Sequence, residues 1–112
     1  MLSEMDLKLK EAETILDWLH KDDHLVVLDE KGKTWDSRGV ARYLQRCADE
    51  GQKNLIFLIG GAYGLHDSVI KRAQAVWSLS PLTFPHQLVR LILAEQVYRA
   101  CTILRNEKYH HG

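Results

Sequence analysis

The sequence has few cysteines, and their placement disfavours two kinds of architecture. Among 112 residues only Cys47 and Cys101 occur, and neither stands in a CxxC or Cys/His spacing. Small secreted domains rely on several disulfides, and structural zinc sites need closely spaced ligands. We therefore expect a reducing compartment, two ordinary buried or half-buried thiols, and no metal site.

Long apolar runs and a targeting segment are absent as well. The longest apolar runs, over residues 55–59 and 91–94, fall far short of the roughly 20 residues that cross a bilayer. The first residues include Glu4, Asp6 and Glu11, whereas a signal peptide begins with a basic region and an apolar core. The sequence predicts a cytoplasmic protein without a membrane partner.

Net charge is also lacking, because 15 Lys and Arg residues balance 15 Asp and Glu residues. The balance is uneven: residues 1–30 hold nine acidic residues against three lysines, and residues 31–112 hold twelve basic against six acidic. The later part could face an anion, but a neutral total argues against strong non-specific binding of nucleic acid. An RNA partner would be recognised by shape or within a larger assembly.

The sequence does contain the pattern of a single α/β domain over residues 1–112. Hydrophobic residues make up 46% and charged residues 27%, as in ordinary globular domains. Helical periodicity favours helices over residues 3–20, 37–49, 67–75 and 86–104, and apolar β-rich runs favour strands over 24–29, 55–59 and 77–79. Their order predicts a layered α/β fold with a mostly parallel sheet.

Start and stop signals refine these elements. We expect Ser3 and Ser37 as helix N-caps, Gly51 as a helix stop, and a turn of the chain at residues 31–33. Two prolines predict an ordered loop over residues 80–85. The last helix is apolar over a wide surface, which indicates contact with a partner as well as with the core. A basic and aromatic tail over 105–112 ends the chain. Its Tyr109, His110 and His111 could bind metal, stack on a base or be disordered, and disorder is the default at a chain end.

Several candidate motifs also have plain structural explanations. The glycine turn at residues 60–64 lies between a strand and a helix, as nucleotide sites do, yet it matches neither the dinucleotide pattern nor the P-loop. His86 opens a helix, where it could orient an anion, transfer a proton or simply begin the helix. Glu95 and Arg99 stand four apart, so an intrahelical ion pair is the default.

Taken together, several segments resemble one family. They are I-G-G-A-Y-G-L-H (59–66), W-S-L-S-P-L-T-F-P-H-Q-L-V-R (77–90), E-Q-V-Y-R-A (95–100) and the closing Y-H (109–110). The earlier V-V-L-D-E-K-G-K (26–33) looks like the same family's first cofactor-loop segment. By these motifs the sequence resembles the ribosomal large-subunit methyltransferase H family, in the SPOUT superfamily of knotted methyltransferases.

The resemblance implies an α/β knot, in which the C-terminal chain threads through a loop to form a deep trefoil. S-adenosylmethionine would sit in the knot, held mainly by backbone groups. By the same resemblance, the cofactor-binding residues are Leu28, Gly61, Ser80, Pro81, Leu82, Thr83, Phe84 and Pro85. A glycine lets the backbone approach the cofactor closely, and two prolines stiffen the loop before binding.

The resemblance also implies a substrate and a partner. Family members methylate N3 of a pseudouridine in an intersubunit stem-loop of the large-subunit rRNA in the assembled ribosome. The chemistry needs no metal, but the N3 imide must lose its proton. The catalytic candidates are His86, Arg90, Arg99, Tyr109 and His110. Members work as homodimers through the last helix, so that one copy's tail would complete the other copy's site.

The sequence departs from the family in two places. Members begin with a strand, a helix and a strand without counterpart here, so a shortened domain with an exposed strand edge is expected. Pro81 replaces a Met or a small residue of the cofactor loop. Two other functions remain open: a non-catalytic knotted protein that binds the cofactor or a partner without methyl transfer, and a nucleotide-binding module using the glycine turn.

Overall fold

The computed structural model describes residues 3–60, 64–79 and 86–110, with the side chains of 86–90 and 107–110 outside the description. The elements follow the predicted order and confirm an α/β fold. They are α1 (Glu4–Trp18), β1 (His24–Thr34), α2 (Ser37–Asp49), β2 (Leu55–Ile59), α3 (Asp67–Arg72), β3 (Ala75–Ser78) and α4 (His86–His110). In the described residues, no helix is both long enough and apolar enough to span a membrane.

β1 is the central strand of a three-stranded sheet with the order β2-β1-β3. It pairs in parallel with both neighbours, which confirms the predicted parallel sheet. Leu25, Val26 and Val27 are fully buried, because a central strand covered on both faces is removed from water. The parallel connections run through α2, between β1 and β2, and through α3, between β2 and β3.

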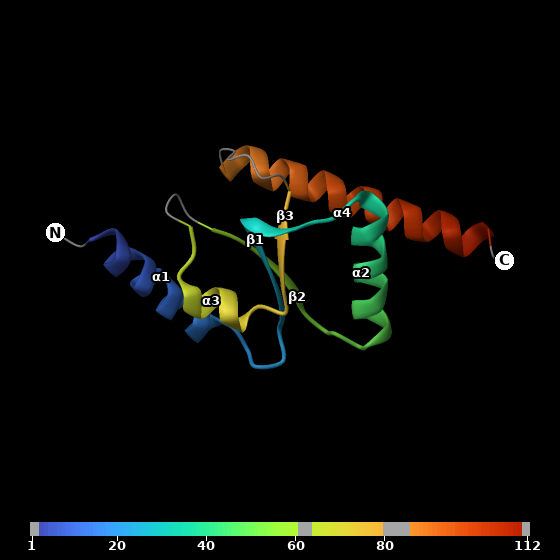
Figure 1. Ribbon diagram of the computed structural model, residues 1–112. Coiled ribbons are helices and arrows are strands. Elements are labelled where there is room, and N and C mark those ends of the chain that lie inside the picture. Colours follow the sequence, from blue (N-terminus) through green and yellow to red (C-terminus); the bar gives the residue numbers. More distant parts are fainter. Residues whose placement is uncertain (1–2, 61–63, 80–85, 111–112) are drawn as a thin grey trace.

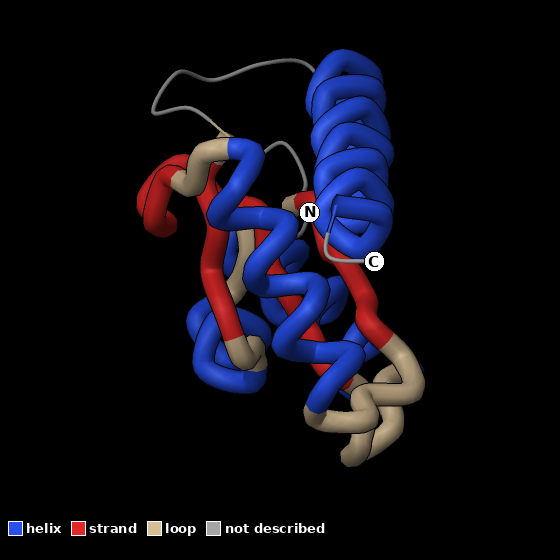
Figure 2. The backbone as a smooth tube through the Cα atoms, turned by 90° about the vertical axis from the view of Figure 1, so that its right-hand side faces the viewer, coloured by secondary structure: helices blue, strands red, loops and turns tan. Residues whose placement is uncertain are grey.

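Helices cover both faces of the sheet (Figure 1). Successive residues of β1 point to opposite faces. Val26 and Leu28 therefore join the core beneath α2 and α4, whereas Leu25 and Val27 join a second core beneath α1 and α3. Figure 2, seen from the α2 side, shows the strands running behind α2 with α4 alongside.

The helix N-caps give one confirmation and one correction. Ser3 caps α1 through a capping box: the Asp6 N–H donates to Ser3 Oγ at 3.1 Å, and the Ser3 N–H donates to Asp6 Oδ2 at 3.2 Å. The predicted cap Ser37 is wrong, because Asp36 caps α2 and accepts a backbone N–H at 2.7 Å. The Ser37 hydroxyl instead donates to Gln96 Oε1 on α4 at 3.1 Å, which joins the two helices.

Several element ends also differ from expectation. α3 ends at Arg72, whose guanidinium bonds two backbone carbonyls just before β1, both at 3.0 Å. β3 accordingly begins at Ala75, two residues earlier than predicted. α4 continues to His110, so the prediction of a disordered tail is wrong as far as that residue. The segment contains no glycine or proline to end the helix. Gly51 follows α2 with φ 73°, as the predicted stop.

A buried polar cluster lies at the amino end of β1. His24 Nε2 shares a short hydrogen bond with the Tyr43 hydroxyl and lies 3.7 Å from Cys47 Sγ. Burial lowers the pKa of His24 and raises the pKa values of Tyr43 and Cys47, so all three side chains are neutral at pH 7. Cys47 is buried as predicted, but Cys101 is exposed, and that part of the prediction is wrong.

Candidate active site

The carboxyl ends of the three strands meet at one edge of the sheet, which we call the carboxyl edge. Leu28 on β1 pairs with Ile59 on β2 and with Trp77 on β3. β2 ends at Ile59, and β3 ends one residue after Trp77. In open α/β sheets, ligands bind outside the carboxyl ends of the strands. Three segments are implied as cofactor-binding: Leu28, the glycine turn and the loop over 80–85. The strands that carry or precede them lie side by side at this edge.

Leu28 is the implied cofactor residue that the structure describes. It is 7% exposed and packs in the core beneath α2 and α4, so a ligand at this position would meet backbone rather than side chain. The other implied residues, Gly61 and Ser80, Pro81, Leu82, Thr83, Phe84 and Pro85, lie outside the described residues. Their described neighbours, Gly60 and Leu79, directly follow β2 and β3.

The described part of the glycine turn after β2 is compact. Gly64 has a φ of 81°, a conformation that residues with a Cβ disfavour. A Cβ added to Gly60 would lie 3.0 Å from the Leu65 side chain, which is itself buried. His66 then caps α3 by accepting the Ser68 N–H through Nδ1 at 3.1 Å. The described glycines thus present backbone rather than side chain next to the carboxyl edge.

The predicted turn at residues 31–33 is wrong, because β1 bulges there and continues to Thr34. Leu28 and Lys33 both pair with Trp77, so the residues between them leave the regular ladder. A Cβ added to Gly32 would lie 2.7 Å from the carbonyl carbon and oxygen of Val76. A side chain at position 32 therefore does not fit where the bulge of β1 passes the backbone of β3. From the sequence, Gly32 is expected only as part of a turn and of the first cofactor-loop segment, although a glycine inside a β-rich run is a signal of close backbone approach.

Trp77 places an unsatisfied donor at the carboxyl edge. Its ring is 1% exposed and stacks on Trp35, with centroids 5.4 Å apart and an interplanar angle of 19°. Among the described residues, no acceptor bonds its indole Nε1–H. Buried donors are nearly always paired, so this N–H is open to an acceptor from outside the described residues. From the sequence, Trp77 is expected only to begin a strand and to belong to a family motif.

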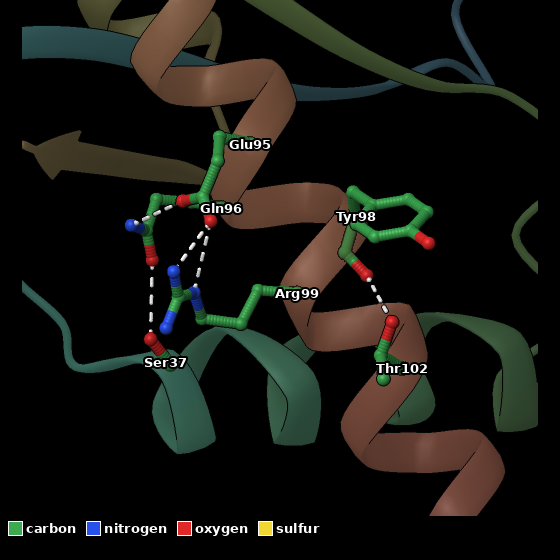
Figure 3. A network of polar contacts seen from close by, with 6 residues as sticks. All are labelled: Ser37, Glu95, Gln96, Tyr98, Arg99 and Thr102. Atoms are coloured by element: carbon green, nitrogen blue, oxygen red, sulfur yellow. Dashed lines mark hydrogen bonds and ion pairs between the residues drawn. The ribbon is translucent and has the colours of Figure 1, made fainter.

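Arg99 is the catalytic candidate whose side chain the structure describes. It pairs with Glu95, as the spacing predicted: Nη2 lies 2.5 Å and Nε lies 3.1 Å from Glu95 Oε1. This pair raises the pKa of Arg99. Gln96 bonds both Glu95 and Ser37, so Arg99 sits where α4 meets the start of α2 (Figure 3). The guanidinium must leave Glu95, or act together with it, to contact an anion.

The remaining catalytic candidates lie at the two ends of α4. His86 opens the helix with Arg90 nearby, and Tyr109 and His110 close it; the side chains of all four are outside the description. α4 has 25 residues, so at 1.5 Å per residue its ends are about 36 Å apart. Within one chain, the structure does not bring His86 and His110 together.

α4 carries two apolar stripes with different surroundings. Leu93, Ala100 and Leu104 pack on the core, whereas Leu91 and Tyr98 are 67% and 74% exposed. The exposed stripe is the surplus apolar surface that the sequence predicted. An open hollow of about 620 Å³ lies between α4 and β2, lined by Phe57, Ile59, Leu93, Ala94, Val97 and Tyr98.

Comparison with known proteins identifies a family model and several close relatives. A model described as a predicted SPOUT methyltransferase matches residues 2–110. The chain is 52% identical over 110 residues to the ribosomal RNA large subunit methyltransferase H of Flavobacterium johnsoniae, covering 98% of this chain and 70% of that protein. It is 50% identical to the proteins of the same name from Christiangramia forsetii and Cytophaga hutchinsonii, covering 98% of this chain and 70% and 71% of theirs.

The contact between Gly32 and β3 gives a testable prediction. In Gly32→Ala the new methyl group would meet backbone atoms of Val76, which cannot move aside as a side chain can, and we expect the free energy of unfolding to fall by about 1–3 kcal/mol. Gly39→Ala on α2 is the comparison variant, because its methyl group would lie 3.1 Å from Asp36 Oδ1, the end of a side chain that can shift, and alanine favours a helix. Any loss of stability there is confined to the cap bond from the Gly39 N–H to Asp36. Urea unfolding followed by tryptophan fluorescence measures both. Equal stability of the two variants would show that the bulge does not need glycine.

Proposed function

We propose that this chain methylates large-subunit ribosomal RNA with S-adenosylmethionine as the methyl donor, because it belongs to the ribosomal RNA large subunit methyltransferase H family of the SPOUT methyltransferases. Family membership makes it an rRNA methyltransferase. The finer proposal is that the acceptor is N3 of a pseudouridine in an intersubunit stem-loop of 23S rRNA, methylated in the assembled ribosome.

One observation carries the cofactor assignment: Leu28, Ile59 and Trp77 are adjacent in the register of the sheet. The three segments assigned to the cofactor therefore begin side by side. The described residues suit the cofactor, since the edge offers backbone at Leu28 and Gly64, an apolar surface, and the unpaired Trp77 indole donor. We propose that the loop over 80–85 and α4 complete the pocket in a trefoil knot.

The chemistry asks the protein mainly to position groups and to handle one proton. S-adenosylmethionine supplies a methyl group on a positively charged sulfur, which is open to displacement by a deprotonated N3. Arg99 is suited to stabilise the negative charge that develops on the base. His86 and His110 are the candidates for the proton, because imidazole titrates near neutral pH. Arg90 and Tyr109 are proposed to hold phosphate and base.

The geometry of α4 favours a site shared between two copies of the chain. His86 and His110 are about 36 Å apart along one helix, so both can serve one reaction only if they come from different chains. The exposed stripe with Leu91 and Tyr98 supplies apolar surface for such a homodimer. In this arrangement, the tail of one copy reaches the carboxyl edge of the other.

Calorimetry followed by an activity assay tests the function. We expect S-adenosylmethionine to bind the full chain, ATP not to bind, and labelled methyl groups to pass to 23S rRNA in ribosomes that lack the modification. Mass spectrometry of the rRNA fragments locates the methyl group. Cofactor binding without transfer would favour the non-catalytic knotted protein, ATP binding would favour the nucleotide module, and no binding at all would overturn both cofactor-based functions.

Mixing two inactive variants tests whether the site is shared. We expect His86→Ala and His110→Ala each to lose most methyl transfer. After subunit exchange, half of the dimers should be mixed, and each mixed dimer keeps one complete site, so activity should return to about a quarter of the wild-type value. A chain carrying both substitutions, mixed with either single variant, is the control and should recover nothing. Failure to recover activity, or a monomer in sedimentation of the wild type, would refute the shared site.

A further inference from the structure

We propose that three arginines on the outer face of α2 form a ridge that binds the phosphate backbone of the rRNA next to the methylated base. The ridge consists of Arg38, Arg42 and Arg46, all exposed. The inference rests on the proposed function, because it names the surface by which that site would hold its substrate.

The ridge has a fixed direction and a regular spacing. The arginines stand four residues apart, so they follow one stripe of the helix and recur about every 6 Å along its axis. The opposite face of α2 holds Val40 and Cys47, which are 2% and 4% exposed. Because that buried face anchors the helix on the sheet, α2 cannot rotate, and the ridge must face away from the core.

The guanidinium groups of the ridge are largely unpaired. Within the described residues, Arg38 and Arg42 make no ion pair. The nearby carboxylate of Asp36 already accepts a backbone N–H as the cap of α2, and Asp49 accepts from the Gln45 amide. Among the described residues, Arg38 and Arg42 therefore present positive charge that no carboxylate neutralises.

Arg46, the third arginine of the ridge, is weakly paired. Its Nε lies 3.8 Å from Glu50 Oε1, and both side chains are more than half exposed, at 63% and 52%. Such an exposed ion pair contributes little to the stability of the fold, so Arg46 can leave Glu50 to bind another anion. The Arg46 guanidinium also lies over the Tyr43 ring, 4.9 Å from its centroid, which holds the charge at a defined place on the helix.

The residue type points to phosphate. All three positions are arginine, whose planar fork matches phosphate oxygens with two hydrogen bonds. On the other side of the sheet, α1 carries two lysines, Lys8 and Lys10, among five acidic residues. Because the whole chain is neutral, attraction to RNA requires a local cluster of this kind.

The first arginine of the ridge lies close to Arg99, one of the proposed catalytic residues. Arg38 follows Ser37, whose hydroxyl bonds Gln96 beside the Glu95–Arg99 pair (Figure 3). From there α2 runs away from α4 (Figure 1). An RNA strand whose target base lies near Arg99 can therefore lay its flanking phosphates along α2.

The test compares two charge-neutralised forms of the full chain. Arg38→Gln/Arg42→Gln removes two charges from the ridge, and Lys8→Gln/Lys10→Gln removes two charges from α1, of the half-buried Lys8 and the exposed Lys10, as the control. Binding of each fluorescently labelled protein to unmodified ribosomes is measured by anisotropy over a range of salt concentrations. This readout does not depend on methyl transfer, so it remains decisive even if the proposed catalytic activity fails.

We expect the ridge variant to bind ribosomes about tenfold more weakly at low salt and to lose about two units from the slope of log K against log salt. Its melting temperature and its affinity for S-adenosylmethionine should match the wild type, and Arg38→Lys/Arg42→Lys should keep the salt slope. An unchanged affinity would overturn the proposal. Weaker binding with an unchanged salt slope would also overturn it, in favour of a contact with ribosomal protein.

Discussion

The parallel pairing of β1 with both of its neighbours is the constraint on which the rest of the structure depends. Leu25, Val26 and Val27 are fully buried, and their side chains alternate between two cores. A shift of β1 by one residue would therefore move each side chain into the opposite core. The register that results places Leu28 between Ile59 and Trp77. The carboxyl edge is therefore a direct consequence of how the central strand is packed.

The residues of the candidate site come from this edge and from α4. Gly32 lets the bulge of β1 cross the backbone of β3, and Trp77 contributes a buried donor without an acceptor among the described residues. The family assignment gives the edge its proposed ligand. α4 contributes Arg99 near the start of α2, but its length separates His86 from His110. The described cofactor segments thus adjoin one another within a single copy, whereas the proposed catalytic residues at the two ends of α4 do not.

Local signals in the sequence predicted most of the elements, because caps, stops and periodic patterns act over a few residues. Ser3 is such a case, and its cap is confirmed. Contacts between distant segments were not predictable. Ser37 resembles a cap, but its hydroxyl is bonded to Gln96 on another helix. Residues 31–33 have the composition of a turn, but in the structure they form a bulge of β1 in which Gly32 packs against the backbone of β3. The family resemblance singled out Leu28, which the structure places at the carboxyl edge, yet only the structure shows how far apart the candidates on α4 lie.

Hydrogen exchange of the full chain, with and without saturating S-adenosylmethionine, tests whether the segments meeting at the carboxyl edge form one cofactor pocket. The expected result is slower exchange of backbone amides in residues 28–32, 60–64 and 77–85 together, with α1 unaffected. Slower exchange in only one of these segments, or protection elsewhere with none at the carboxyl edge, would contradict a single pocket.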